Sequence, residues 1–504
     1  MNLGEMLSEA ARLYGDKTAI VQGKRRFSYR QLDEDSNRLA NALREIGVGR
    51  GDRVAILLDN CYQFVIIYFG IVRLGASAVP LDTKYKALEI SAVFDDCRPK
   101  VLFTEGGCSA LAAALAAGLG YIKKVVDISS QPLPGLLSYQ HLIDSGSPEP
   151  VADARSEDIA HIAYTSGPTL RPRGAMLIQE RLVAGIALSA AGFKQTGDDV
   201  VMLFALPMHH AVGMVVAMLT SLSQGSTVVI LPGFSMSALL ESVERERVTI
   251  FMGVPFVYAL LLREIEEKNL RPDLSSLRIC ASAGAPLEVS LIRRFKDVLG
   301  KKLIQFDGLT EATVQVTCQP IDGSGKDGAV GKVLPLFKIK IMNDAGRTLR
   351  LGEAGEIMVK GPIMKGYYNS EVATATAIED GWLHTGDIGR FDEDGQLYIM
   401  ALKKPMLISK GQNIYFSDLE DVLAGHPAVA AVKADGIPDP EGMRGEVVRA
   451  VIRLKEGRAA TEAEIRKYCL DRIANYKAPK QVIFSDSIPG WQDTTSAAGR
   501  VSVS

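Results

Sequence analysis

The sequence predicts an α/β protein: a large N-terminal domain with two parallel-sheet αβ subdomains and an antiparallel β subdomain, then a small α+β C-terminal domain. Three observations predict this architecture. Strand–helix–strand alternation occurs twice, over residues 53–80 and 200–231, short strands separated by turn signals fill 328–398, and the pattern changes again after about residue 400. Apolar strands that alternate with helices are typical of parallel sheets covered by helices.

Both alternating regions follow the same order of elements. Each holds a short apolar, β-branched run that predicts a buried strand, then a helical stretch, then a second strand. The first region is expected to contain a strand at Arg53–Leu58, a helix at Tyr62–Leu74 and a strand at Ala76–Pro80. The second is expected to contain a strand at Val200–Leu206, a helix at Gly213–Gln224 and a strand at Thr227–Leu231.

Turn residues and a change in the sequence pattern predict the remaining elements. Turn signals at residues 344–346, 352–355 and 392–395 predict hairpins of an antiparallel sheet. Beyond them we expect a helix near Asp418–Leu423, strands at Val429–Asp435 and Val447–Leu454, and a helix at Thr461–Ala474. We therefore expect domains at residues 1–400 and 401–504.

Composition and charge exclude several classes of protein. The 504 residues are 47% hydrophobic and 23% charged, which argues against intrinsic disorder. A net charge of −2, from 57 basic and 59 acidic residues, gives no electrostatic footprint for nucleic acid or an anionic membrane. The longest apolar stretches, 64–72 and 211–219, are far shorter than the roughly 20 residues that span a bilayer. No transmembrane segment and no nucleic-acid partner are therefore expected.

The N-terminus and the cysteines indicate the compartment. The first residues carry acids where a signal peptide needs basic residues and an apolar run. The six cysteines are scattered without a CxxC pair, so neither a disulfide framework nor a zinc site is expected. These features favour a cytoplasmic, multi-domain enzyme.

The first candidate for chemistry is the loop from Tyr164 to Gly174. It follows an apolar run, Ile159–Ala163, that predicts a strand, and it is rich in Gly, Ser and Thr. Backbone N–H groups and hydroxyls of such a loop bind phosphate oxygens well. The alternative is a polar surface turn, and the common P-loop pattern GxxxxGK[ST] is absent.

Three further segments extend this candidate: 308–311 (GLTE), 381–389 (GWLHTGDIG) and 409–415 (SKGQNIY). Other segments join them in the same order: 27–32, 49–54, 206–210, 361–369 and 476–479. Together with the first loop, this collinear set resembles the adenylate-forming superfamily of acyl-CoA synthetases, luciferases and peptide-synthetase adenylation domains. The resemblance covers essentially the whole chain, and it implies a β-barrel-like antiparallel subdomain and a mobile C-terminal domain.

The resemblance implies a two-step reaction that uses ATP, Mg²⁺ and coenzyme A. A carboxylate attacks the α-phosphate to give an acyl-adenylate and pyrophosphate, and coenzyme A then takes the acyl group as a thioester. It also implies roles for residues. Four match the loop that holds the β- and γ-phosphates, namely Thr165, Ser166, Gly167 and Thr169. Thr310 would contact the α-phosphate, Glu311 would bind Mg²⁺, and Asp387 would bind the ribose hydroxyls.

Further matches complete the implied site. Residues 282–286 match the segment beside adenine, with Gly284, Ala285 and Pro286 as contacts, and His210 matches the residue near the acyl carboxylate. Lys410 and Gly411 match the coenzyme A path. The acyl pocket would be lined by the helix after His210 and by residues 253–255, 281–284 and 313–314, which are small or apolar and favour an uncharged acyl group.

Several positions depart from the family pattern. Pro168 lacks a backbone N–H, Leu170 stands in place of glycine, and Arg173 keeps the charge of the usual lysine in a planar form. Asp307 replaces an aromatic residue beside adenine, where it could accept a hydrogen bond from the exocyclic amine. Ala401 and Leu402 replace an Asp-Arg pair, Pro405 falls on the hinge, and Arg500 stands in place of the family's catalytic lysine.

Two hypotheses follow. In the first, the protein is an ATP-dependent acyl-CoA synthetase that acts on a fatty or aromatic acid. In the second, the substitutions have removed adenylation, and the protein binds acyl-CoA, a nucleotide or a partner, or catalyses another acyl transfer. The acceptor, coenzyme A or a carrier protein, and the choice between monomer and homodimer stay open.

Overall fold

The computed structural model describes residues 1–165, 172–313, 315–403, 406–409, 412–439, 446–486 and 488. Two compact units divide the chain. The first takes in the described residues up to 403, and the second takes in nearly all of those from 406 onwards. The domain boundary expected at residue 400 stays a prediction.

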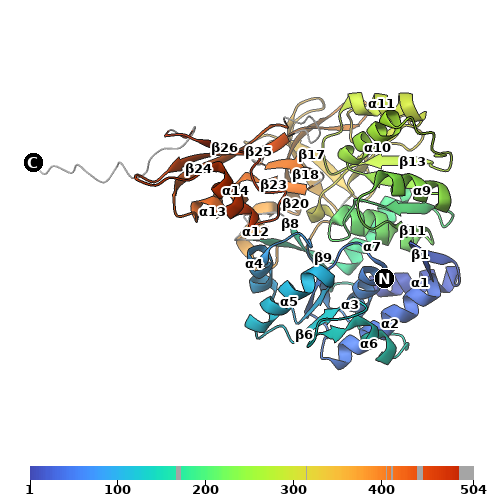
Figure 1. The fold of residues 1–504 in the computed structure, drawn as a ribbon. Helices are drawn as coiled ribbons and strands as arrows, with labels where there is room; N and C mark the ends of the chain where they lie inside the picture. Colours follow the sequence, from blue (N-terminus) through green and yellow to red (C-terminus); the bar gives the residue numbers. More distant parts are fainter. Residues whose placement is uncertain are drawn as a thin grey trace, which may run out of the picture. The chain divides into compact units, whose positions relative to one another are not determined.

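A seven-stranded sheet forms the first layer of the N-terminal unit (Figure 1). Its strand order is β7 (Leu137–Ser138), β6 (Lys124–Asp127), β5 (Val101–Thr104), β3 (Arg53–Leu57), β4 (Ser77–Pro80), β8 (Ile159–Thr165) and β9 (Arg173–Ile178). All pairs are parallel except β8 with β9. The connecting helices are α3 (Tyr62–Arg73), α4 (Ala87–Cys97), α5 (Gly106–Gly118) and α6 (Tyr139–Ser145). The predicted parallel sheet is confirmed, because βαβ crossovers bring successive strands side by side in one direction.

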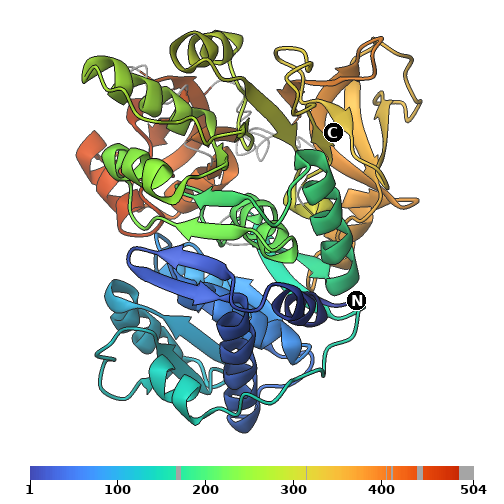
Figure 2. The ribbon, with the colours of Figure 1, turned by 90° about the vertical axis from the view of Figure 1, so that its right-hand side faces the viewer.

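A nine-stranded sheet forms the second layer, and Figure 2 separates its green helices from the blue ones around the first sheet. Its order is β16 (Lys332–Val333), β15 (Thr317–Cys318), β14 (Leu303–Asp307), β13 (Ile279–Ser282), β12 (Ile250–Gly253), β10 (Val200–Leu203), β11 (Thr227–Ile230), β1 (Thr18–Gln22) and β2 (Arg25–Ser28). The six strands from β14 to β1 are parallel. Its helices include α7 (Gln179–Phe193), α8 (Thr220–Ser223), α9 (Met236–Glu246), α10 (Pro255–Glu267) and α11 (Val289–Leu299).

The first two helices pack beside the seven-stranded sheet. Helix α1 (Leu3–Tyr14) contacts both α2 (Tyr29–Glu45) and α3. A capping box starts each: Asn2 with Glu5 in α1, and Ser28 with Gln31 in α2. Each box satisfies N–H groups that the first helical turn cannot bond internally.

Antiparallel strands complete the N-terminal unit. They are β17 (Lys338–Met342), β18 (Gly355–Lys360), β19 (Ile378–Glu379), β20 (Trp382–Phe391) and β21 (Leu397–Leu402), with α12 (Glu371–Ala377) before β19. The three predicted turns hold Gly346, Gly352 and Gly395 at φ of 76°, 86° and 73°. Glycine reaches this left-handed region without steric cost, so the turn signals were diagnostic.

The C-terminal unit is α+β, as predicted. Strands β24 (Val429–Pro438), β25 (Glu446–Leu454) and β26 (Gln481–Phe484) form one sheet, and β22 (Met406–Ser409) pairs with β23 (Gln412–Tyr415). Its helices are α13 (Phe416–Ala424) and α14 (Glu462–Leu470). Asp418 and Lys477 form a buried ion pair at 3.5 Å within this unit.

The helix predicted at 213–224 differs from the expectation. Most of it is a π-helix, η1 (Val212–Leu219), which continues into α8. The Thr220 hydroxyl donates to the carbonyl of Val215 at 2.8 Å, five residues earlier. Residues 213–219 are buried on every side, so apolar spacing could not separate a π-helix from an α-helix.

None of the helices in the described ranges has the length and apolarity needed to cross a bilayer.

Candidate functional site

The predicted site residues gather where the parallel strands of the nine-stranded sheet end. His210 follows β10, Gly284 follows β13, and Asp307 is the last residue of β14. Thr310 and Glu311 form the short 3₁₀ helix η2 (Thr310–Ala312) directly after β14. Ligands of open α/β sheets bind at these carboxyl ends, so the topology itself brings the residues to one edge.

The hairpin of β8 and β9 supplies a second element of the site. Thr165 and Arg173 are register partners at its open end. The Thr165 hydroxyl donates to Oε1 of Glu311 at 3.4 Å. The structure thus joins the end of the first sheet to the end of the second. Ser166, Gly167, Pro168, Thr169 and Leu170 lie outside the described residues, as do Val314, Pro405, Lys410, Gly411 and Arg500.

Glu311 is held through one of its two carboxylate oxygens. The hydroxyl of Tyr367 donates to Oε1 at 2.9 Å, and this is the same oxygen that Thr165 reaches. Among the residues that the structure describes, no hydrogen bond reaches Oε2. The carboxylate is therefore oriented with one oxygen open. Sequence reasoning gave Tyr367 no role, although it stands in the family-like segment 361–369.

This geometry suits magnesium. In the described part of the chain, no three His, Cys, Asp or Glu side chains gather closely enough to hold a metal by themselves. Mg²⁺ does not need such a cage, because it takes one or two protein carboxylates and fills its shell with substrate phosphates and water. An oriented glutamate with an open oxygen fits that requirement.

Asp307 lies near enough to Asp387 for the charge of one carboxyl group to affect the other. Burial, and then the nearby negative charge of Asp387, raise the pKa of Asp307 from 3.8 to about 8, against a smaller opposing effect of the Gly308 N–H. Asp307 is thus mostly protonated at neutral pH, and its carboxylic acid can donate a hydrogen bond as well as accept one. The sequence suggested only an acceptor at this position.

The segment beside the predicted adenine position exposes its backbone. Gly284 has φ of 76°, a conformation that favours glycine, and both Gly284 and Pro286 are exposed while Ala285 is half-buried. A flat ligand could approach this backbone closely.

His210 sits in a turn that other residues hold in place. The amide of Asn60 donates to the carbonyl of Leu206 at 2.8 Å and accepts from the N–H of Met208 at 2.7 Å. His209 precedes His210, and its Nε2 lies 3.8 Å from Asp82. Sequence reasoning missed this arrangement because Asn60 and Asp82 come from the other sheet.

Both histidines are neutral at physiological pH. Burial lowers the pKa of His209 to about 3, despite the opposing charge of Asp82. Burial also lowers the pKa of His210. A neutral imidazole offers one donor and one acceptor, so His210 can orient an acyl carboxylate without adding a charge.

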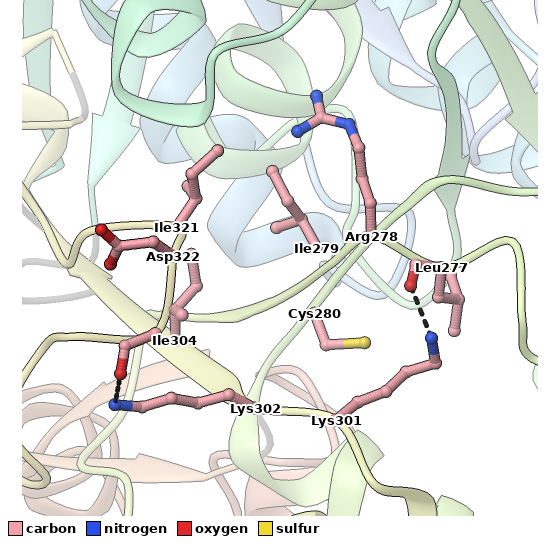
Figure 3. A pocket seen from close by; sticks show the side chains of 10 residues that line it. Leu277, Arg278, Ile279, Cys280, Lys301, Lys302, Ile304, Ile321 and Asp322 are labelled. Atoms are coloured by element: carbon pink, nitrogen blue, oxygen red, sulfur yellow. Dashed lines mark hydrogen bonds between the residues drawn. The ribbon is translucent and has the colours of Figure 1, made fainter.

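A separate cavity of about 190 Å³ lies at the amino ends of β13 and β14, the edge opposite to the candidate site (Figure 3). Lys301 Nζ donates to the carbonyl of Leu277 at 2.7 Å, and Lys302 Nζ donates to that of Gly323 at 2.5 Å. Arg278 pairs with Asp199 at 2.5 Å. These three cationic side chains already have partners within the protein, and the cavity is therefore not part of the candidate site.

The chain is similar to known proteins over nearly its whole length. Residues 7–368 match the family model described as AMP-binding enzyme, and residues 418–493 match the model described as AMP-binding enzyme C-terminal domain. An indoleacetate–CoA ligase of Aromatoleum aromaticum is 34% identical over 493 residues, which cover 97% of this chain and 95% of the relative. A long-chain-fatty-acid–CoA ligase of Bacillus subtilis is 31% identical over 519 residues, 97% of this chain and 91% of the relative. The solved structure of the amide bond synthetase McbA from Marinactinospora thermotolerans is similar with a TM-score of 0.88 at 28% identity, and the match covers 97% of this chain and 96% of McbA.

Proposed function

Because the chain belongs to the AMP-binding enzyme family of the adenylate-forming superfamily, we propose that it activates a fatty or aromatic carboxylic acid with Mg-ATP and transfers the acyl group to coenzyme A. Acyl-CoA synthetase-like activity follows from the family, and the kind of acid is the finer step. The observation that supports the proposed use of Mg-ATP is the gathering of four residues around one sheet edge: Thr165, Glu311, Asp307 and Asp387.

The proposed roles follow the geometry. Glu311, oriented through Oε1, would ligate the Mg²⁺ that travels with the nucleotide and neutralises phosphate charge. Thr165 and Arg173 would contact the terminal phosphates, and Thr310 the α-phosphate. Asp387 would accept from ribose hydroxyls, while the protonated Asp307 would donate to an adenine ring nitrogen or accept from its amine. Gly284, Ala285 and Pro286 would flank the ring.

The bonds in each step balance. A carboxylate oxygen of the acid attacks the α-phosphorus, and the bond to the bridging oxygen of pyrophosphate breaks. The thiolate of coenzyme A then attacks the acyl carbon, and AMP leaves with the electrons of the acyl–oxygen bond. The protein contributes mainly by holding the reactants and stabilising developing charge, and His210 would orient the acyl carboxylate.

Other parts of the proposal rest on sequence alone. Arg500 would replace the usual lysine, Lys410 and Gly411 would border the coenzyme A path, and Pro405 would sit at the hinge between domains 1–400 and 401–504. The apolar residues of η1 and β12 favour an uncharged acyl group. Cytoplasmic location and a homodimer stay predictions.

The alternative, loss of adenylation, is not favoured. Two relatives that cover nearly the whole chain are named as CoA ligases. McbA is an amide bond synthetase, so an amine is a second acceptor class to be tested beside coenzyme A.

The direct test is ATP–pyrophosphate exchange over a panel that includes indoleacetate, hydroxycinnamates and fatty acids of increasing length, followed by thioester formation with coenzyme A. We expect exchange with apolar acids, and a loss of about 10²-fold in Glu311→Gln, the usual magnitude for a lost charge-stabilising group. Glu393→Gln is a matched control, because Glu393 is exposed in a turn. An absence of exchange with every acid of the panel, at high enzyme concentration, would contradict the proposal.

A further inference from the structure

Residues 365–368 are hydrogen-bonded along the outer edge of β9. Three backbone hydrogen bonds join them: Met176 N–H to Gly366 at 2.9 Å, Lys365 N–H to Met176 at 2.8 Å, and Tyr368 N–H to Gly174 at 2.7 Å. The segment therefore behaves as an added antiparallel strand, and its side chains have fixed directions. Tyr367, in the middle, is only 7% exposed.

Residues 362–364 are hydrogen-bonded to the loop that carries Glu311. The N–H of Met364 donates to the backbone carbonyl of Glu311 at 2.6 Å, and the Thr313 hydroxyl donates to that of Pro362 at 2.6 Å. Arg181 donates to the carbonyl of Met364 at 2.9 Å and to the one before it at 2.7 Å. The backbones around Glu311 and Tyr367 are thus fixed relative to each other, independently of their side chains.

The side chain of Tyr367 makes two contacts with predicted site residues. Its hydroxyl donates to Oε1 of Glu311 at 2.9 Å, a charge-assisted bond in a buried place. The guanidinium of Arg173 lies 5.8 Å from the centre of its ring, within the range of a cation–π contact. One tyrosine therefore touches both the predicted metal ligand and the predicted phosphate contact.

We propose that Tyr367 is a positioning residue for nucleotide activation: its hydroxyl fixes Oε1 of Glu311, which leaves Oε2 to bind the divalent cation of the nucleotide. Thr165 supports the same oxygen from a longer distance of 3.4 Å. The inference rests on the proposed use of Mg-ATP and adds a residue through which Glu311 acts. The groups that orient metal ligands typically contribute 10–100-fold to metal affinity.

The test removes the hydroxyl and keeps the ring. In Tyr367→Phe the contact with Arg173 can remain, whereas the bond to Glu311 is lost. Tyr368→Phe is the matched control, because it removes a tyrosine hydroxyl one residue along, on the side that faces the helices α4 and α5. Melting temperatures of both variants report whether the fold is retained.

Calorimetric titration with ATP, in the presence of Mg²⁺ and again in EDTA, provides a readout other than turnover. We expect Tyr367→Phe to weaken binding of ATP about tenfold with Mg²⁺ and to leave it unchanged in EDTA. Tyr368→Phe should match the unmodified protein in both. A rise in the Mg²⁺ concentration needed for half-maximal exchange, with recovery of kcat at saturating Mg²⁺, should accompany the loss.

The Glu311→Gln background tests whether Tyr367 acts through Glu311. If it does, adding Tyr367→Phe to Glu311→Gln should cost little more, because the two residues form one unit. Additive losses, equal losses with and without Mg²⁺, or no loss at all would overturn the inference while leaving the proposed function intact. An unmodified protein that binds no ATP would overturn both.

Discussion

Replacement of Asp307 by asparagine should change the way in which stability depends on pH. Burial and the neighbouring charge of Asp387 raise the pKa of Asp307 to about 8 in the folded protein, whereas the unfolded chain ionises near 3.8. Between these values the folded state holds a proton that the unfolded state has released. The free energy of unfolding therefore falls as pH rises from about 4 to about 8, and then levels off.

The size of the effect follows from the pKa difference. Each pH unit above 3.8 lowers the free energy of unfolding by about 1.4 kcal/mol, which reaches about 4 kcal/mol at pH 7. Asp307 is half-buried, so partial solvation reduces this to about 2 kcal/mol. Asparagine is a neutral isostere of the protonated acid. The advantage of Asp307→Asn over the unmodified protein should thus grow by about 1–3 kcal/mol between pH 5 and pH 7.

Urea denaturation at pH 5, 6 and 7, with both proteins measured at each pH, is the appropriate assay. Asp198→Asn, the same substitution at an exposed position, serves as the control. Asp387→Asn should remove only part of the dependence, since burial is the larger cause of the shift. A stability difference for Asp307→Asn that stays constant from pH 5 to pH 7 would refute the reasoning.

Three further predictions concern packing and thiols. Gly331→Ala should lower the free energy of unfolding by at least about 2 kcal/mol, because φ is 97° and the new methyl group would overlap the backbone of Cys318; a melting temperature within a degree of the original would contradict this. Tyr258→Phe should cost about 1 kcal/mol in denaturant titrations, because the buried hydroxyl, 2.8 Å from the carbonyl of Phe251, loses its bond; an unchanged midpoint would argue against it. In native protein a thiol reagent should label Cys108 first, since the other cysteines are buried, and the rate should still rise above pH 8 because burial raises the pKa of Cys108; labelling that persists in Cys108→Ser would show the assignment wrong.

Local sequence patterns predicted most of the strands and turns of the fold. The strands β3, β4, β10 and β11 fall within or beside the apolar runs that predicted them, because β-branched residues bounded by turns favour buried strands. The hairpin turns of the antiparallel sheet were visible as glycines. The π-helix η1 was not, because its register depends on backbone bonding that a uniformly apolar sequence does not reveal.

The motif spacing predicts the site residues one by one, but it does not predict which of them are in contact. Glu311, Asp307 and Asp387 could be placed from motif spacing, and the structure adds which of them meet. Tyr367 reaches Glu311, and Asp82 lies near His209, across long stretches of chain. Such pairs are set by strand order and register, which a single sequence does not encode in any local pattern. The raised pKa of Asp307 comes first from burial and then from Asp387 in another sheet, and no local pattern of the sequence shows either.

The register pairing of Thr165 with Arg173 has an evolutionary consequence. The chain leaves the sheet at Thr165 and re-enters it at Arg173, which are adjacent positions, and β8 and β9 are paired along their length. We therefore expect changes of sequence between Thr165 and Arg173 to leave the pairing of β8 with β9 intact. Replacement of this stretch by the corresponding one from a relative, followed by measurement of the free energy of unfolding, would test that expectation.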